Sequence, residues 1–195
     1  IKMNLSDGLL KALDTTSKVE KKAETTNTKA YELYLKAKHT YEKRENTNDT
    51  ETARILLHKA IKIDDNIITA KTLLSRTFYE MGNYDKAMKI LIPTLKQAQK
   101  VDNKSGIAAC LSNIGTVYHI NDKNEQALDY FKRSLIICEE INDKHGMGYC
   151  LNNIATAQSL RGDNDDTLHY YRKSLLIQEE LGNQMGMGST LSNIG

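Results

Sequence analysis

The amino-acid sequence predicts an all-α protein, a right-handed α-solenoid of stacked helix-turn-helix units. The first observation is a repeat, since Gly106, Gly146 and Gly186 are spaced by 40 residues (146 − 106 and 186 − 146), which indicates stacked copies of one supersecondary unit. The second is local: apolar residues recur at three- and four-residue steps in two runs per period, separated by turn formers. The third is composition, because one proline and no tryptophan in 195 residues suit continuous helices.

The first part of the chain is expected to lead into the repeats. Residues 1–27 should contain a short amphipathic helix around Leu5–Leu13, followed by a polar link. The first repeat unit is expected over 28–66. Its two helices should cover Ala30–Arg44 and Glu51–Ile63, with a polar stretch between them.

The later units show the helical pair most clearly. In 106–120, Ile107, Leu111 and Ile114 mark one apolar face. Asn121–Asn124 is a run of turn formers, and a second helix is expected from about Glu125 to Ile141. The remaining units are expected over 67–103, 104–143 and 144–183, followed by the first helix of a truncated unit over 184–195.

Large and small residues recur at fixed positions of the units. Two helices that pack at about 8–10 Å need a small residue where their axes cross, flanked by large ones. Gly115 is such a small residue, and Phe131 is a large one. In the first helices the recurring sets are Lys71/Leu74/Ser75/Phe78, Leu111/Ile114/Gly115/Tyr118 and Leu151/Ile154/Ala155/Gln158. In the second helices they are Ala87/Leu91/Thr94, Ala127/Phe131/Ser134 and Thr167/Tyr171/Ser174.

This pattern resembles the tetratricopeptide repeat (TPR), a helix-turn-helix of 34 residues. The longer period of this chain is similar to the subgroup of kinesin light chains and Pins/LGN spindle-orientation proteins. Ala30–Lys36 and Tyr41–Arg44 also resemble the lead-in to the repeats of bacterial class III adenylate/guanylate cyclase-type proteins. This second resemblance implies an alternative role, as a regulatory or dimerising arm of a nucleotide cyclase-type signalling protein. We expect the sequence to be a piece of a longer chain.

The resemblance implies a non-catalytic scaffold that binds a protein or peptide in its concave groove. In the family the first helices line this groove, and asparagines there hold the backbone of an extended peptide. Asn113, Asn153 and Asn193 share one position in successive units, and an amide offers both a donor and an acceptor. The alternative is that these asparagines bond neighbouring helices. Further expected groove residues are Arg76, Tyr79, Thr116, His119, Tyr149, Asn152 and Thr156.

Composition and motifs argue against several other classes of function. The formal net charge is only +2, so we expect no nucleic-acid partner. The five histidines are scattered without metal-ligand spacing, and no nucleophile–base pair is visible. Gly146-Met-Gly148 lacks the rest of a nucleotide-binding fingerprint, so close packing is the better interpretation. We therefore expect no enzyme activity in this segment, no metal and no cofactor.

The remaining expectations concern location and assembly. No apolar run is long enough to cross a bilayer. Three cysteines without close pairing favour buried thiols in a reducing compartment, hence the cytoplasm. The last helix should expose Leu191 and Ile194, and such an apolar face could pair two copies of the chain into a homodimer.

Overall fold

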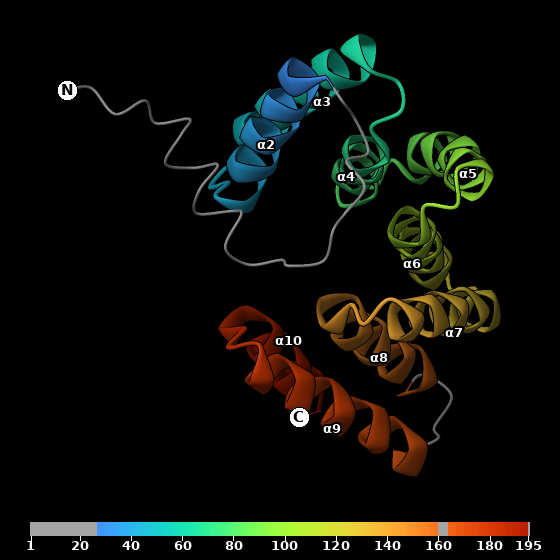
Figure 1. Ribbon diagram of the computed structural model, residues 1–195. Helices are drawn as coiled ribbons and strands as arrows, with labels where there is room; N and C mark the ends of the chain where they lie inside the picture. Colours follow the sequence, from blue (N-terminus) through green and yellow to red (C-terminus); the bar gives the residue numbers. More distant parts are fainter. Residues whose placement is uncertain (1–26, 160–163, 195) are drawn as a thin grey trace.

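The computed structural model describes residues 27–159 and 164–194. All regular structure in these residues is helical (Figure 1). The helix expected around Leu5–Leu13 and most of the break before residue 164 lie outside the described residues. The helices are α2 (Thr28–Glu42), α3 (Thr47–Ile63), α4 (Ile68–Tyr79), α5 (Tyr84–Lys100), α6 (Lys104–Ile120), α7 (Asn124–Glu140), α8 (Lys144–Ser159), α9 (Asn164–Glu180) and α10 (Gln184–Ile194).

Short polar side chains start several of these helices by capping exposed backbone N–H groups. Asn103 Oδ1 accepts a hydrogen bond from the N–H of Gly106 at 2.8 Å. Asp143 and Asn183 make the equivalent bond in the next two units, each at 3.1 Å. The cap therefore recurs with the period of the repeat in these three units, and it fixes where α6, α8 and α10 begin.

The observed start of α3 differs from the expectation. The sequence pattern suggested Glu51, whereas the helix begins at Thr47. The reason is a capping box: Asn46 caps the N–H of Asp49, and the Asp49 side chain in turn accepts from the N–H of Asn46. A polar stretch that reads as a loop is therefore the first turn of the helix.

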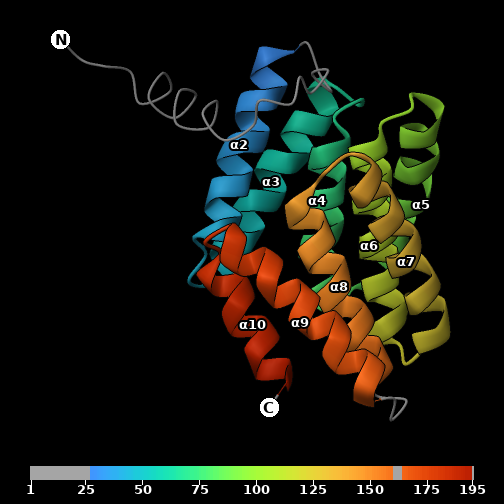
Figure 2. The same ribbon diagram turned by 60° about the horizontal axis from the view of Figure 1, so that its bottom comes forward.

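Consecutive helices form antiparallel pairs, and the pairs stack into an arc (Figures 1 and 2). The first helices α2, α4, α6, α8 and α10 each contact the next first helix along the stack. Among the described residues, the second helices α3, α5, α7 and α9 do not contact one another. The stack therefore curves, with the first helices on its inner side. These findings confirm the expected all-α solenoid.

The core lies between successive pairs and depends on close approach at the small positions. A Cβ atom on Gly115 would lie 2.7 Å from Cε1 of Phe131, whose ring is almost fully buried. A Cβ atom on Gly146 would lie 2.5 Å from the sulfur of Cys138 in the preceding unit. Close packing thus accounts for Gly146, the first glycine of Gly146-Met-Gly148. Cys110, Cys138 and Cys150 are all buried, and none is disulfide-bonded.

Candidate functional site

The asparagines of the inner wall bond the first helix that precedes their own. Asn113 Nδ2 donates to the carbonyl oxygen of Thr72 at 3.3 Å. Asn193 Nδ2 donates to Oδ1 of Asn152 at 3.3 Å and to Oγ1 of Thr156 at 3.4 Å. Thr72 and Asn152 each lie 41 residues before their partner asparagine. The amide nitrogens thus join neighbouring first helices in a fixed register.

The middle asparagine departs from this pattern. Nδ2 of Asn153 is buried and has no hydrogen-bond partner among the described residues. The residue 41 positions earlier is Ser112, whose hydroxyl oxygen is also buried without a partner in that part of the chain. Buried polar groups without partners cost about 1–3 kcal/mol each. The centre of the wall therefore holds two unsatisfied polar groups between α6 and α8.

The expected groove residues Thr116, His119 and Thr156 are half-buried and bonded locally. Thr116 Oγ1 donates to the Ser112 carbonyl at 3.1 Å, and Thr156 Oγ1 to the Asn152 carbonyl at 2.9 Å. His119 Nδ1 lies 2.7 Å from Oδ1 of Asn124, which ties the ring to the start of α7. The structure therefore groups Asn152, Thr156 and Asn193, and separates His119 from them.

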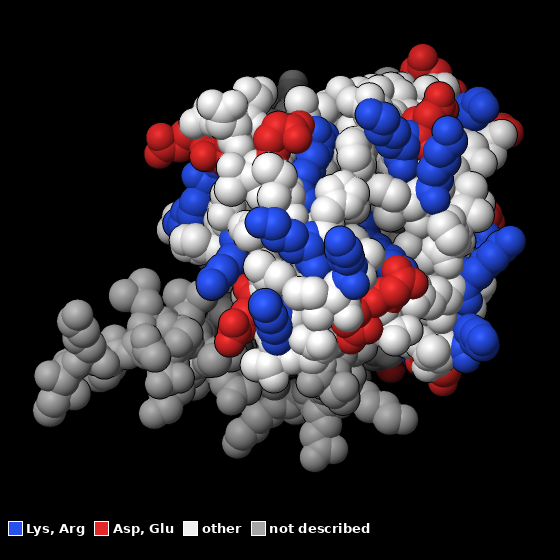
Figure 3. All heavy atoms as spheres, turned by 90° about the horizontal axis from the view of Figure 1, so that it is seen from above, with Lys and Arg blue, Asp and Glu red and all other residues white. Residues whose placement is uncertain are grey.

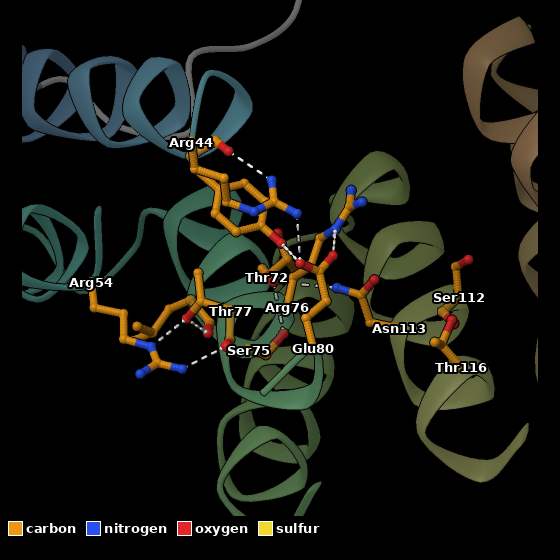
Figure 4. A network of polar contacts seen from close by, with 12 residues as sticks. Arg44, Arg54, Thr72, Ser75, Arg76, Thr77, Glu80, Ser112, Asn113 and Thr116 are labelled. Atoms are coloured by element: carbon orange, nitrogen blue, oxygen red, sulfur yellow. Dashed lines mark hydrogen bonds and ion pairs between the residues drawn. The ribbon is translucent and has the colours of Figure 1, made fainter. Parts of the chain in front are cut away.

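A charged cluster occupies the inner wall where α2 and α4 end (Figure 4). Arg76 Nε donates to Glu80 Oε1 at 2.8 Å, and Arg44 Nη2 donates to Glu80 Oε2 at 2.9 Å. The hydroxyl of Tyr41 also donates to Oε2 of Glu80. The Arg44 guanidinium lies over the Tyr41 ring, 4.0 Å from its centre. Two guanidinium groups thus share one carboxylate, which leaves the cluster with one positive charge in excess.

Tyr79 and Tyr149 lie beside this cluster. Tyr79 is 5% exposed and packs in the core between α4, α5 and α6, whereas Tyr149 of α8 is 37% exposed. Burial raises the pKa of Tyr79 well above its usual value, and the neighbouring Tyr149 adds to the rise. Burial also raises the pKa of Tyr41, and the hydrogen bond to Glu80 raises it further. Both hydroxyls therefore stay neutral donors at neutral pH.

Tyr41, Arg44 and Glu80 were not expected as site residues from the sequence. The sequence does contain a signal for this cluster, because two of its charged residues stand at positions where later units have uncharged residues. Arg76 stands where the next two units have Thr116 and Thr156, and Glu80 stands where the next has Ile120 (76 + 40 = 116 and 80 + 40 = 120). Departures from a repeat mark positions where packing does not dictate the residue.

The arrangement suits recognition by hydrogen bonds and charge. It offers amides, hydroxyls and a partly exposed guanidinium along one curved wall. Within the part of the chain that the structure describes, no group of three or more His, Cys, Asp and Glu side chains could hold a metal ion. No helix in that part is long and apolar enough to span a bilayer.

Comparison with known families gives a clear result. A family model described as "Tetratricopeptide repeat" matches residues 66–140 and again 106–180. Together these ranges cover more than half of the chain. No curated protein sequence matches the chain.

Several solved structures share the fold. One is a Rap protein complexed with competence and sporulation factor (18% identity, 83% of this chain and 46% of that chain, TM-score 0.73). A second is aspartyl phosphate phosphatase F from Bacillus subtilis (18% identity, 83% and 43%, TM-score 0.69). A third is a signal transduction ATPase with a tetratricopeptide repeat sensor from Pyrococcus horikoshii (17% identity, 85% and 25%, TM-score 0.70). The chain spans less than half the length of each, and at such identities the likeness shows the fold alone.

Proposed function

Because the chain belongs to the tetratricopeptide repeat family, we propose that it is a scaffold that binds an extended peptide along its inner wall. Such solenoids work by offering a long concave surface to another protein. The observation that carries the proposal is the wall itself. Successive first helices lie side by side there and present a polar row that ends in a charged cluster with excess positive charge.

Two kinds of contact would hold the peptide. The Asn113 amide nitrogen bonds Thr72, so its oxygen is the atom left to accept an N–H from a peptide backbone. At the charged cluster, Arg76 is 45% exposed and bonds Glu80 through Nε. Its remaining N–H groups can donate to a carboxylate of the peptide. The amides would fix the backbone, and the arginine would select an acidic side chain or a chain terminus.

The Rap structure supports this proposal as an analogy, because there a TPR-like chain is complexed with competence and sporulation factor. Its 18% identity to this chain does not carry over the identity of any ligand.

The test compares two arginines in the same local setting. Arg76 bonds Glu80 and Arg133 bonds Asp129, each four residues apart along its helix, and the two arginines are 45% and 49% exposed. Arg76 faces the inner wall, whereas Arg133 lies on the second helix α7. We expect Arg76→Gln to weaken capture of peptides from a synthetic peptide array and Arg133→Gln to leave it unchanged. Helix content by circular dichroism should be the same for both variants.

If both variants retain the same peptides as the wild type, Arg76 does not contribute to peptide binding. Combining Asn113→Ala and Asn153→Ala tests the amides in the same assay. If neither the arginine nor the amides affect capture, the inner wall is not the binding surface.

Two finer assignments remain proposals about the whole protein. The lead-in resemblance favours the alternative role as an arm of a nucleotide cyclase-type protein, and the long period favours the kinesin light chain and Pins/LGN subgroup. In the structure, Tyr41 and Arg44 of the lead-in bond Glu80 of the next unit, so the lead-in is an integral part of the stack. A cyclase domain encoded next to this segment in its gene would support the alternative, and its absence there would exclude it.

We also propose that the chain acts in the cytoplasm and pairs through its last helix. The buried thiols, none of which is disulfide-bonded, suit a reducing compartment. Met185, Leu191 and Ile194 of α10 are 83%, 52% and 39% exposed, and such an apolar face favours association. Light scattering on the wild type and on Leu191→Glu tests the pairing. A monomeric mass for the wild type would exclude a dimer.

A further inference from the structure

A second recessed surface lies away from the inner wall, between the second helices α3 and α5. These helices do not contact each other, and they leave a cleft of about 480 Å³ whose floor includes α4. The cleft is lined by His58, Ile61, Asp65, Lys71, Leu74, Ile90, Pro93, Thr94 and Gln97.

The cleft exists because this unit departs from the repeat at three positions. Lys71 stands where the next unit has Leu111 (71 + 40 = 111), which is 2% exposed and packs in the core. Ile90 and Gln97 stand where α7 has Tyr130 and Ile137 (90 + 40 = 130 and 97 + 40 = 137). Tyr130 stacks on Tyr118 with ring centres 5.3 Å apart, and so fills the corresponding space. In the cleft, the smaller Ile90 takes the place of Tyr130, and the polar Lys71 and Gln97 take the places of Leu111 and Ile137.

Lys71 places a positive charge at the cleft. Its side chain is 13% exposed, and Nζ lies 2.8 Å from Oε1 of Gln97 and 2.8 Å from Oδ1 of Asp65. Gln97 is itself held, because its Nε2 donates to the Asp65 carbonyl at 2.9 Å. An ammonium group has three N–H donors, so these two partners leave one for an acceptor in the cleft. Asp65 is 76% exposed, and therefore offsets the charge only through a solvated carboxylate.

The walls and the rim of the cleft define the chemistry of an occupant. The walls provide apolar contacts from Ile61, Leu74, Ile90 and Pro93. The helices beside the cleft carry an excess of positive charge, because α3, α5 and the turn after α3 together hold seven lysines and arginines against five acidic residues. The basic residues are the buried Arg54 and Lys59, Lys62, Lys86, Lys89, Lys96 and Lys100, and the acidic ones are Asp49, Glu51, Asp64, Asp65 and Asp85. Lysines and arginines, with aspartates and glutamates among them, are spread over the face of the molecule shown in Figure 3.

We propose that this cleft binds an acidic peptide segment, with an apolar side chain against Leu74 and Ile90 and a neighbouring carboxylate on Nζ of Lys71. Lys71 and the positive excess of α3 and α5 complement such a segment, and the apolar walls select a side chain beside the acid. No Phe, Tyr or Trp lines the cleft, so it lacks the stacking surface that single-stranded nucleic acids use. The cleft and the inner wall share α4 but are lined by different residues of it, so the cleft would let the scaffold hold two partners at once.

The experiment uses Lys71→Leu, which installs the residue that the repeat has at this position. Because Leu111 packs in the core of its own unit, we expect Lys71→Leu to fold with an unchanged or raised melting temperature. The wild type is first screened on an array of short synthetic peptides of random sequence. Peptides that pair Asp or Glu with Leu, Ile or Met within two residues should be enriched. Lys71→Leu should bind the best of these more than about ten-fold more weakly.

Three controls make the result specific. Arg76→Gln on the inner wall should bind the same peptide as tightly as the wild type does, and replacing the acid of the peptide by its amide should weaken binding as much as Lys71→Leu does. Methyl NMR signals of Leu74 and Ile90 should shift when the peptide is added. The proposal is overturned if Lys71→Leu retains the peptide, if enriched peptides lack acids, if no peptide binds, or if only a thymidine oligonucleotide loses affinity in this variant.

Discussion

Asn113 shows how one side chain can serve packing and recognition together. Its amide nitrogen donates to Thr72 in the preceding first helix, while the residue as a whole is only half-buried. The two hypotheses for the asparagine row are therefore compatible, because different atoms of the amide carry each role. A substitution that removes the N–H donors of the amide and keeps an acceptor oxygen can measure the structural role on its own.

Asn113→Asp makes that separation. The carboxylate keeps two acceptor oxygens but has no N–H to donate, and it would face the carbonyl oxygen of Thr72. We expect the free energy of unfolding in urea to fall by about 1–2 kcal/mol. The same change at the exposed Asn193 should cost less. Equal unfolding midpoints for wild type and Asn113→Asp would show that the bond to Thr72 contributes nothing to stability.

The buried tyrosines Tyr41 and Tyr79 make the free energy of unfolding depend on pH in the alkaline range. Burial, reinforced by Glu80 at Tyr41 and by Tyr149 at Tyr79, raises the pKa of both hydroxyls in the folded state. The unfolded value is about 10, so folding favours the neutral form. This contribution to stability is fully present below pH of about 10 and is lost as pH rises toward the folded-state pKa values.

We therefore expect the free energy of unfolding to fall more steeply above pH of about 10 in the wild type than in the double variant Tyr41→Phe/Tyr79→Phe. Urea titrations at several alkaline pH values measure the two slopes. The double variant starts from a lower stability, because Tyr41 no longer bonds Glu80, so only the slopes are compared. Parallel curves would mean that neither hydroxyl is linked to folding.

At the scale of the helices, the repeat made the fold predictable. A glycine recurs where helices approach closely, and apolar residues recur at helical spacing, so each unit supports the interpretation of the others. The charged cluster was not predictable in the same way. Glu80 meets Tyr41 and Arg44 from 39 and 36 residues away, and neither partner recurs in later units. The repeat thus predicts the packing and the asparagine row, whereas the charged cluster lies at positions where the repeat is broken.

Two glycines test how closely the helices approach. A Cβ atom on Gly115 would meet the ring of Phe131, whereas one on Gly188, also in a first helix, meets nothing within 4 Å. Alanine gains about 1 kcal/mol over glycine in a helix, and overpacking costs about 1–3 kcal/mol. We expect Gly188→Ala to raise the melting temperature and Gly115→Ala to lower it. The reverse order would contradict the packing of α6 against α7.

At the scale of the whole molecule, contacts are confined to neighbours in the stack. Each of α2, α4, α6 and α8 contacts the second helix of its own pair and the first helices of the adjacent pairs. Within the described residues, α2 and α3 make no contact with α6 or any later helix. Stability is then close to a sum of local terms. One consequence is that the cleft between α3 and α5 and the row at Asn193 are held by different helices. Occupation of one need not alter the other.

Hydrogen exchange with Gly115→Ala tests this locality. Because Gly115 lies in α6 against Phe131 of α7, the substitution should speed amide exchange in α6 and α7 and in the adjoining α5 and α8. Exchange in α2 and α3 should match the wild type, since these helices open through their own contacts. Gly188→Ala provides the control, with no acceleration in α6. If exchange instead rises equally in every helix, the stack unfolds as one cooperative unit, and a partner bound at either surface would stabilise both.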